Sequence, residues 1–232
     1  MKLGIMQPYF LPYIGYFQLI AAVDVFIVYD NIKYTKKGWI NRNRLLLYGT
    51  DSLFSVPLKK DSDTLHVVQR ELSSDFNRHK LLSQVKRAYS KSPHFSETFQ
   101  VLERIVLFDN PNLFQYVHHS IVEICRYLEI ETEIKVSSTI PINHDLKSQD
   151  KVIALCESMK ADTYINTLGG IDLYNKDVFL ANGIELQFIK PNSLEYVQFG
   201  LPFVPWLSII DVLMFNSPNE VRECIHFNFE LI

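Results

Sequence analysis

The sequence predicts an α/β protein with a Rossmann-like open sheet, mostly parallel, that carries an inserted β-hairpin and helical segments. Residues 2–6 and 24–29 have the pattern of strands, and a helical pattern over 13–23 joins them into one βαβ unit. After Asp24 the second strand is apolar at nearly every position, which is typical of a parallel strand covered on both faces. Strand and helix patterns alternate again over 132–189.

The intervening segments predict the other elements in turn. Residues 44–58 read as a hairpin around a Gly-Thr-Asp turn at 49–51, and a short strand follows at 64–68. Ser208 is the expected N-cap of a last helical region, with Asp211 at its third position. The remaining expected elements are helices at 77–90, 95–107 and 112–128, a strand at 132–137, a helix at 148–160 opened by Ser148 or Asp150, a strand at 162–166, a helix at 174–182 and a strand at 184–189.

The length of 232 residues suits a single domain spanning 1–232. We expect the Rossmann-like core in 1–30 and 130–190, the hairpin and helical insertion in 40–128, and a helical C-terminal tail in 205–232. The hydrophobic fraction of 47% and the net charge of -3 argue against a disordered chain. They also argue against non-specific binding to nucleic acid or to a membrane surface.

Cysteine usage and the N-terminal segment predict a cytoplasmic protein. The three cysteines, Cys125, Cys156 and Cys224, form no CxxC pair, so we expect no zinc site and a reducing compartment. The apolar N-terminal run is interrupted by two prolines and a glycine and is closed by Asp24 and Asp30. It is too short to span a bilayer and does not read as a signal peptide, so we expect no membrane insertion.

The turn after the first strand predicts a ligand site. Residues 7–16 follow that strand and open a helix, whose first N–H groups and dipole favour a phosphate or a carboxylate. Gly15 would let a ligand approach the helix closely. A tight turn with packed tyrosines is the alternative interpretation. The residues expected to contact the ligand are Gln7, Tyr9, Tyr13, Gly15 and Tyr16.

The basic and aromatic segment after the second strand is expected to share that site. Arg42 can hold a phosphate or carboxylate with two hydrogen bonds, and lysines add positive charge. Trp39 and Tyr34 can stack on a base or pack on a sugar face. The alternative is a solvated basic loop leading into the hairpin. The candidate binding residues here are Lys33, Tyr34, Lys37, Trp39, Arg42 and Asn43.

Two further strand ends add candidates. Ser137 ends a strand, where its hydroxyl could contact a phosphate or form a turn. Gly169 and Gly170 form a turn through which a ligand could approach the backbone, and Tyr174 follows; a tight turn without a ligand is the alternative. The seven histidines form no metal-binding pattern, so we expect no metal held by the protein alone. For a catalytic role we select Asp30, His79 and His94.

Two resemblances extend this interpretation. The arrangement Phe-x-Pro-Tyr-x-Gly-Tyr over residues 10–16 resembles the HxGH signature of the nucleotidylyltransferase superfamily. Tyr13 and Tyr16 stand where that signature has histidines, so positive charge would have to come from Lys33, Lys36, Lys37 or Arg42. The string GIMQPYFLPYIGYFQLI, with KKGWINRNRL, YINTLGGIDLY and PWLSIIDVLMFN further on, resembles the WbqC-like protein family much more closely. That resemblance implies bacterial O-antigen or surface-polysaccharide biosynthesis.

The resemblances and the residues together favour an enzyme that acts on a nucleotide-linked amino sugar. The expected reaction is acyl or aminoacyl transfer to the sugar amine, and one route to it uses ATP with Mg²⁺ to make an acyl-adenylate. Nucleotidyl transfer to a sugar phosphate and non-catalytic binding of a sugar nucleotide are the alternatives. The expected partner is the sugar nucleotide as a small-molecule substrate, with no nucleic acid, and a homodimer is one assembly open to the chain.

Overall fold

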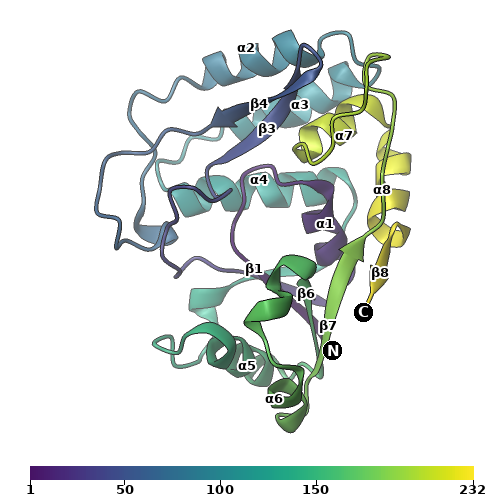
Figure 1. Cartoon of the computed structure of the whole chain (residues 1–232). Helices are drawn as coiled ribbons and strands as arrows, with labels where there is room; N and C mark the ends of the chain where they lie inside the picture. Colours follow the sequence, from purple (N-terminus) through teal and green to yellow (C-terminus); the bar gives the residue numbers. More distant parts are fainter.

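The computed structural model describes all 232 residues and contains a six-stranded sheet of order β5-β2-β1-β6-β7-β8 (Figure 1). The first five strands in that order are parallel, and β8 pairs antiparallel with β7 at the edge. The predicted α/β fold with a mostly parallel sheet is therefore confirmed. The strands are β1 (Lys2–Met6), β2 (Val25–Val28), β5 (Glu133–Val136), β6 (Thr163–Thr167), β7 (Glu185–Pro191) and β8 (Phe229–Leu231).

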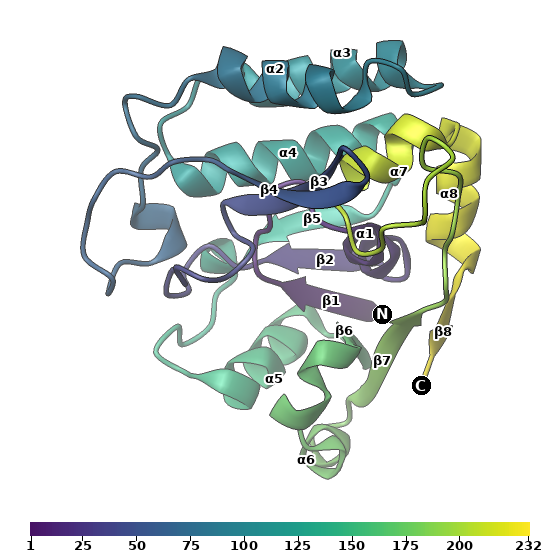
Figure 2. The same ribbon diagram turned by 45° about the horizontal axis from the view of Figure 1, so that its top comes forward.

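Helices cover both faces of the sheet because its central strands are apolar on both sides (Figure 2). Leu3 and Ile5 of β1 belong to a buried cluster with residues of α5 (Ser148–Met159) and α6 (Lys176–Ala181). Phe26 of β2 points the other way, into a larger cluster with α1 (Ile14–Ala21), α4 (Leu113–Tyr127) and α8 (Pro218–Phe227). Val25 and Ile27 of β2 belong to the first cluster, so alternate residues of one strand supply two separate cores.

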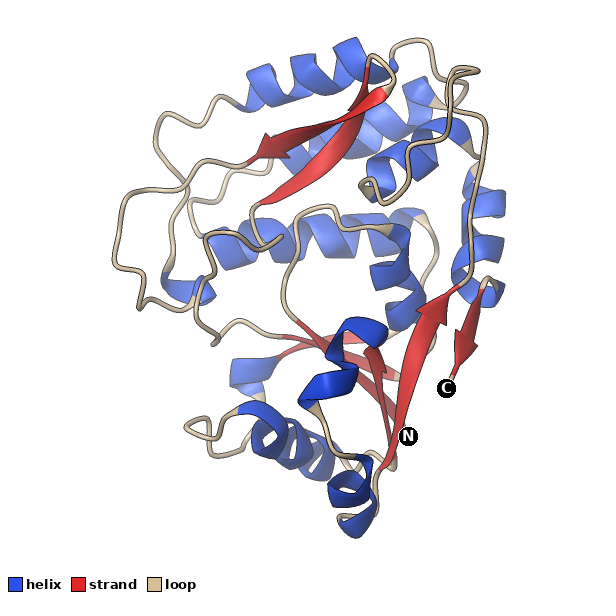
Figure 3. Ribbon diagram, in the orientation of Figure 1, coloured by secondary structure: helices blue, strands red, loops and turns tan.

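The segment between β2 and α4 forms a layer of its own above α4. It contains the hairpin of β3 (Arg42–Leu47) and β4 (Thr50–Ser55), which is separate from the main sheet (Figure 3). The turn is Tyr48-Gly49 rather than the expected 49–51, because both residues have positive φ, as a two-residue turn of type I′ requires. The layer also contains the 3₁₀ helix η1 (Val67–Gln69), α2 (Arg78–Tyr89) and α3 (Phe95–Val106).

The structure corrects two further expectations. No strand forms at 64–68, where only an isolated bridge joins His66 to Lys33 before η1 begins. The C-terminal tail is not helical throughout: α7 (Ile209–Phe215) ends before α8 starts, with Pro218 in its first turn and a capping box of Ser217 and Glu220. The tail then ends in β8, whose backbone extends the sheet beside β7.

Two short 3₁₀ helices, η2 (Ser137–Thr139) and η3 (Leu168–Leu173), follow β5 and β6. No helix combines the length and apolarity needed to cross a membrane.

Candidate functional site

The reversal of strand order around β1 places a crevice at the carboxyl ends of β1 and β6. From β1 the sheet continues to β2 on one side and to β6 on the other. In open α/β sheets the connections leave such neighbouring strands in opposite directions, and ligands bind where they part. Gln7 follows β1, and Asn166 and Thr167 end β6, and all three side chains line a cavity here. The topology itself therefore indicates where a ligand binds.

This cavity, which we call the cationic cleft, has a volume of about 670 Å³. Lys33, Lys147 and Lys151 line it together with His66, and Asp145 is the only acidic side chain in its lining. The excess of positive charge favours an anionic ligand. The volume lies within the range of small-molecule sites in proteins. No group of three or more histidine, cysteine, aspartate or glutamate side chains is arranged to hold a metal ion.

The N-terminus of α5 opens into the cationic cleft. Lys147 is the N-cap residue, and no side chain caps the helix. The amides of Ser148, Gln149 and Asp150 donate no hydrogen bond within the chain. Ser148 has φ of 48°, a left-handed conformation that costs a non-glycine residue about 1 kcal/mol. Uncapped N–H groups with the positive end of a helix dipole form an anion-binding surface.

Lys151, one turn into α5, brings a buried ammonium group to the same place. Its side chain is only 8% exposed, and it lines the cationic cleft. Its Nζ atom has two distant acceptors, the Asn31 Oδ1 atom at 3.3 Å and the His144 carbonyl at 3.4 Å. Burial lowers the pKa of Lys151, although the nearby Asp30 carboxylate acts in the opposite direction. The ammonium group lacks a close carboxylate partner and is therefore available to an anionic ligand.

The predicted residues Asp30 and Ser137 form a buried support behind the cleft. The Asp30 Oδ1 atom accepts hydrogen bonds from the Ser137 hydroxyl at 2.8 Å and the Ser138 amide at 2.9 Å. Asn31, the next residue, binds the His144 ring through its side-chain amide at 2.9 Å. Neither Asp30 nor Ser137 lines the cavity. Asp30 is buried and its Oδ1 atom already accepts two hydrogen bonds, and its role in catalysis stays a prediction.

A second cavity, the aromatic pocket, adjoins the cationic cleft and has a volume of about 660 Å³. The two share four lining residues at their junction: Met6, Tyr9, Thr167 and Gly169. Five of its sixteen lining residues are aromatic. The tilted rings of Tyr13 and Trp206 lie 5.1 Å apart, and the guanidinium of Arg44 lies 5.4 Å from the centre of the Trp39 ring. The other ring-bearing or basic side chains in the lining are Tyr9, Tyr16 and Lys190.

Comparison with known proteins assigns the chain to a family. The profile of the WbqC-like protein family matches residues 7–223, nearly the whole chain. The chain belongs to the WbqC-like protein family. It is also similar to "Uncharacterized protein Rv1507c" of Mycobacterium tuberculosis (strain ATCC 25618 / H37Rv), with 28% identity over 230 residues that cover 96% of this chain and 98% of the relative. No solved structure matches.

Eleven of the binding residues predicted from the sequence of this WbqC-like family member line one cavity or both. The structure thus brings together the turn after β1, the segment after β2 and the turn after β6. In the cationic cleft these residues are Gln7, Lys33, Gly170 and Tyr174; in the aromatic pocket they are Tyr13, Gly15, Tyr16, Trp39 and Asn43; Tyr9 and Gly169 line both.

Three predicted residues of the basic segment lie outside both cavities. Arg42 donates from Nε to the Gly38 carbonyl at 2.9 Å. Tyr34 is buried, with its hydroxyl on the Asn41 Oδ1 atom at 2.9 Å. Lys37 is exposed to solvent. Asn43, although it lines the aromatic pocket, has a structural task as well, because its Nδ2 atom donates to the carbonyls of Phe10 and Leu11.

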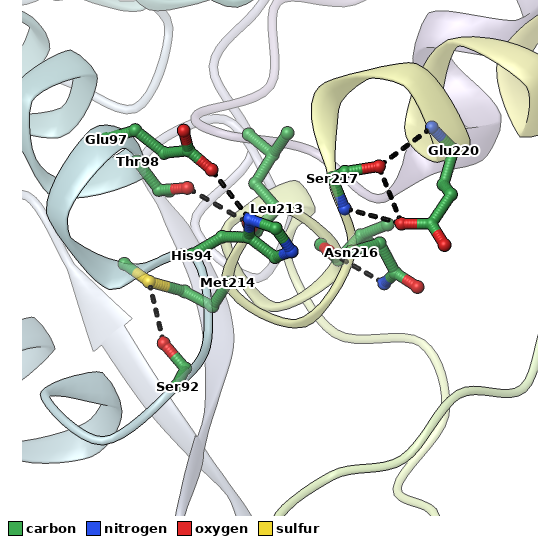
Figure 4. Close-up of polar contacts among 10 residues, drawn as sticks. Ser92, His94, Glu97, Thr98, Leu213, Met214, Asn216, Ser217 and Glu220 are labelled. Atoms are coloured by element: carbon green, nitrogen blue, oxygen red, sulfur yellow. Dashed lines mark hydrogen bonds and ion pairs between the residues drawn. The ribbon is translucent and has the colours of Figure 1, made fainter.

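The two predicted catalytic histidines also lie outside both cavities. His79 is exposed in the first turn of α2. His94 precedes α3, where its Nδ1 atom lies 2.6 Å from the Glu97 carboxylate and its amide donates to the Met214 carbonyl (Figure 4). His94 therefore helps to join α3 to the C-terminal helices. Nothing in the arrangement gives either histidine access to a ligand in the cleft.

Sequence reasoning missed several residues that line the cavities of this family member. Lys147 and Lys151 lie at the start of a helix that the sequence did predict. The sequence placed its opening at Ser148 or Asp150, whereas the N-cap is Lys147 and no side chain caps the helix. His66 is carried by a long irregular segment, and no sequence pattern indicated that its bridge to Lys33 would bring it to the cleft. The other missed residues are Asn31, His144, Asn166, Thr167, Arg44, Lys190 and Trp206.

Proposed function

We propose that this protein acts on a nucleotide-linked amino sugar and transfers an acyl or aminoacyl group to the sugar amine, in the biosynthesis of a bacterial O-antigen or surface polysaccharide. The observation that carries the proposal is that the Lys151 ammonium group and the uncapped N-terminus of α5 lie together in the cationic cleft. Such a pair binds a phosphate, and a diphosphate-linked sugar presents two phosphates beside its ring.

The rest of the cationic cleft suits a sugar. Gln7 and Asn166 offer side-chain amides for hydroxyl groups, and the half-buried rings of Tyr29 and Tyr174 offer flat surfaces for the face of a pyranose. Lys33 and Lys147 at the exposed rim would attract the charged substrate from solution. These features support a phosphorylated sugar ligand over a purely apolar one.

Acylation of the amine requires a proton acceptor. The amine nitrogen attacks the acyl carbonyl carbon, a C–N bond forms, the bond from that carbon to the leaving group breaks, and the nitrogen releases a proton. Two histidines line the cleft. His144 already has hydrogen bonds at both ring nitrogens, to Asn31 and to the Ile140 carbonyl, so its ring is held in place. We assign the proton acceptor to His66, which is exposed in the cleft.

The test incubates the purified protein with UDP- and dTDP-linked amino sugars, small carboxylic acids including glycine, and ATP with Mg²⁺, or with acyl-coenzyme A in place of acid and ATP. Mass spectrometry should detect a new amide on the sugar nucleotide. His66→Gln should reduce the rate at least tenfold. Absence of amide product across the panel, with binding retained, would leave the non-catalytic alternative.

Lys151→Met tests the phosphate site itself. It should weaken binding of UDP-glucosamine at least tenfold in calorimetry, because the methionine side chain keeps the shape and loses the charge. Lys91→Met is the matched control, since Lys91 is exposed and lines neither cavity. Equal affinities for the two variants would contradict the proposal.

A further inference from the structure

The aromatic pocket is a separate chamber with its own ligand-binding equipment. Its volume of about 660 Å³ nearly equals the 670 Å³ of the cationic cleft, and each alone could enclose a nucleotide. The two chambers meet at Tyr9, Thr167 and Gly169. Two ligands bound in them would therefore face each other at this junction.

The walls of the aromatic pocket suit a flat ring. Trp206 is 60% exposed and Trp39 is 38% exposed, which leaves large indole surfaces in contact with water. Tryptophan faces of this kind stack on bases, with a contribution of about 1–3 kcal/mol for each stacked base. Trp206 also has φ of 60° and presents its carbonyl to Arg44 at 3.2 Å, so the backbone holds the indole in position.

The same pocket has groups for an anion. The amides of Ile14 and Gly15 at the start of α1 donate no hydrogen bond within the chain, and α1 has no acidic residue in its first turn. The guanidinium of Arg44 contacts the Asp51 carboxylate at 3.2 Å and the Trp206 carbonyl at 3.2 Å, while its Nε atom is shielded from solvent and has no acceptor. Lys190 adds a second cation from β7. A ring and an anion are therefore accommodated together.

We infer that the aromatic pocket binds the adenosine phosphate part of an activated acyl donor, and this inference rests on the proposed acyl transfer. Acyl-adenylates and acyl-coenzyme A both contain an adenosine phosphate part. The sugar amine attacks the acyl carbon at the junction, a C–N bond forms, and the bond to the phosphate oxygen or thioester sulfur breaks. The leaving group takes the electron pair, and the amine proton passes to His66.

The duplication of anion-binding groups favours two ligands over one. A single sugar nucleotide has one diphosphate, whereas each of the two cavities has an uncapped helix N-terminus in its lining, α1 in the aromatic pocket and α5 in the cationic cleft. Each has cations beside it: Lys147 and Lys151 in the cationic cleft, and in the aromatic pocket Arg44 and Lys190, which also contact Asp51 and Glu230. One spanning ligand would leave one of these sites without an anion.

Calorimetric titrations with AMP, coenzyme A and UDP-glucosamine test the inference. We expect Trp206→Ala to weaken AMP and coenzyme A at least tenfold and to change the UDP-glucosamine affinity less than twofold. Lys151→Met should have the reverse pattern, and Trp206→Phe should restore AMP binding. The AMP affinity should be the same in the presence of saturating UDP-glucosamine. Turnover with ATP and acid, compared with turnover with acyl-coenzyme A, then distinguishes the two donor classes.

Several outcomes would overturn the inference. Competition between AMP and UDP-glucosamine, or equal weakening of both by Trp206→Ala, would mean that one ligand spans both chambers. Absence of AMP and coenzyme A binding at millimolar concentration would also overturn it. The proposed function fails on a different result: a Lys151→Met variant that binds UDP-glucosamine as the wild type does. The two failures are therefore distinguishable.

Discussion

The hydroxyl of Tyr89 donates a 2.8 Å hydrogen bond to the buried carboxylate of Asp211 and accepts one of 2.8 Å from the Leu46 amide. These contacts join α2, α7 and the hairpin, which are far apart in the sequence. Asp211 also accepts from the Tyr196 hydroxyl and from Gln198, both at 2.6 Å. The buried carboxylate thus fixes the loop that leads to Trp206 in the aromatic pocket.

Removal of this hydroxyl should destabilise the fold. In Tyr89→Phe the Leu46 amide loses its acceptor and a fully buried carboxylate loses one of three donors. Hydrogen bonds to charged groups contribute about 1.5–3 kcal/mol, and we expect a loss of about 2 kcal/mol in the free energy of unfolding. Urea denaturation measures it. Tyr48→Phe, at a tyrosine that is 83% exposed, is the control and should be neutral. An unchanged midpoint for Tyr89→Phe would show that the network does not stabilise the fold.

Acid should destabilise the protein through His118 on α4. Burial, followed by the neighbouring His119, lowers the pKa of His118 below its usual 6.5, and its Nε2 atom is buried without a partner. The unfolded chain therefore takes up a proton near pH 6.5 while the folded chain does not. Stability should fall as pH drops from 6.5 toward the folded pKa and level off below it, by about 1.4 kcal/mol for each unit between the two pKa values.

His118→Leu isolates this contribution. Between pH 7 and pH 5 the melting temperature of the variant should fall less than that of the wild type. His226→Gln, at an exposed histidine of α8, should keep the wild-type slope. A His118→Leu variant with the same slope as the wild type would contradict the assignment.

The sequence was informative where a site follows directly from strand order. Gln7 follows β1 directly and Gly169 lies two residues after β6. Parallel strands bring their carboxyl ends to one edge, so the meeting of these two residues could be predicted. Which of Arg42 and Arg44 reaches the aromatic pocket could not be predicted from the sequence. Both lie on one face of β3 and both approach Trp39, and only the packing of the hairpin on Gly38 and Trp206 decides which reaches the pocket.

The remaining misses have the same origin. Asp211 fits the pattern of a helix start, and Ser208 does cap α7 as expected, but the carboxylate turns to Tyr89 instead. The C-terminal strand β8 has only three residues, too few for an alternation to be recognised, and it forms because the edge of β7 is free to pair. Tertiary partners, which local patterns do not contain, determine these features.

Alanine at Gly170 should disturb the cleft, whereas alanine at the adjacent Gly169 should not. A Cβ atom at Gly170 would lie 2.8 Å from the Asn166 Nδ2 atom, so the buried Asn166 side chain would have to move. At Gly169 the nearest atom would be 3.9 Å away. We expect Gly170→Ala to lose about 1 kcal/mol of stability and to weaken UDP-glucosamine binding several-fold. Gly169→Ala is the matched control in urea denaturation and calorimetry; equal behaviour of the two variants would contradict the packing argument.

Lys151→Met should be at least as stable as the wild type at pH 7, in contrast to its loss of ligand binding. The ammonium is buried with only distant neutral acceptors, so a methionine of similar shape removes a desolvated charge.

The lowered pKa of Lys151 gives the pH dependence of this stability difference a definite sign. As pH rises above the folded pKa toward the unfolded value of 10.5, the folded wild type releases this proton while the unfolded chain keeps it. The wild type should therefore gain stability relative to the variant, and the difference measured by denaturation at pH 7 should shrink by pH 10. A difference that grows with pH would mean that the charged lysine stabilises the fold, and the cleft would then lack the unpaired cation on which the proposed phosphate site depends.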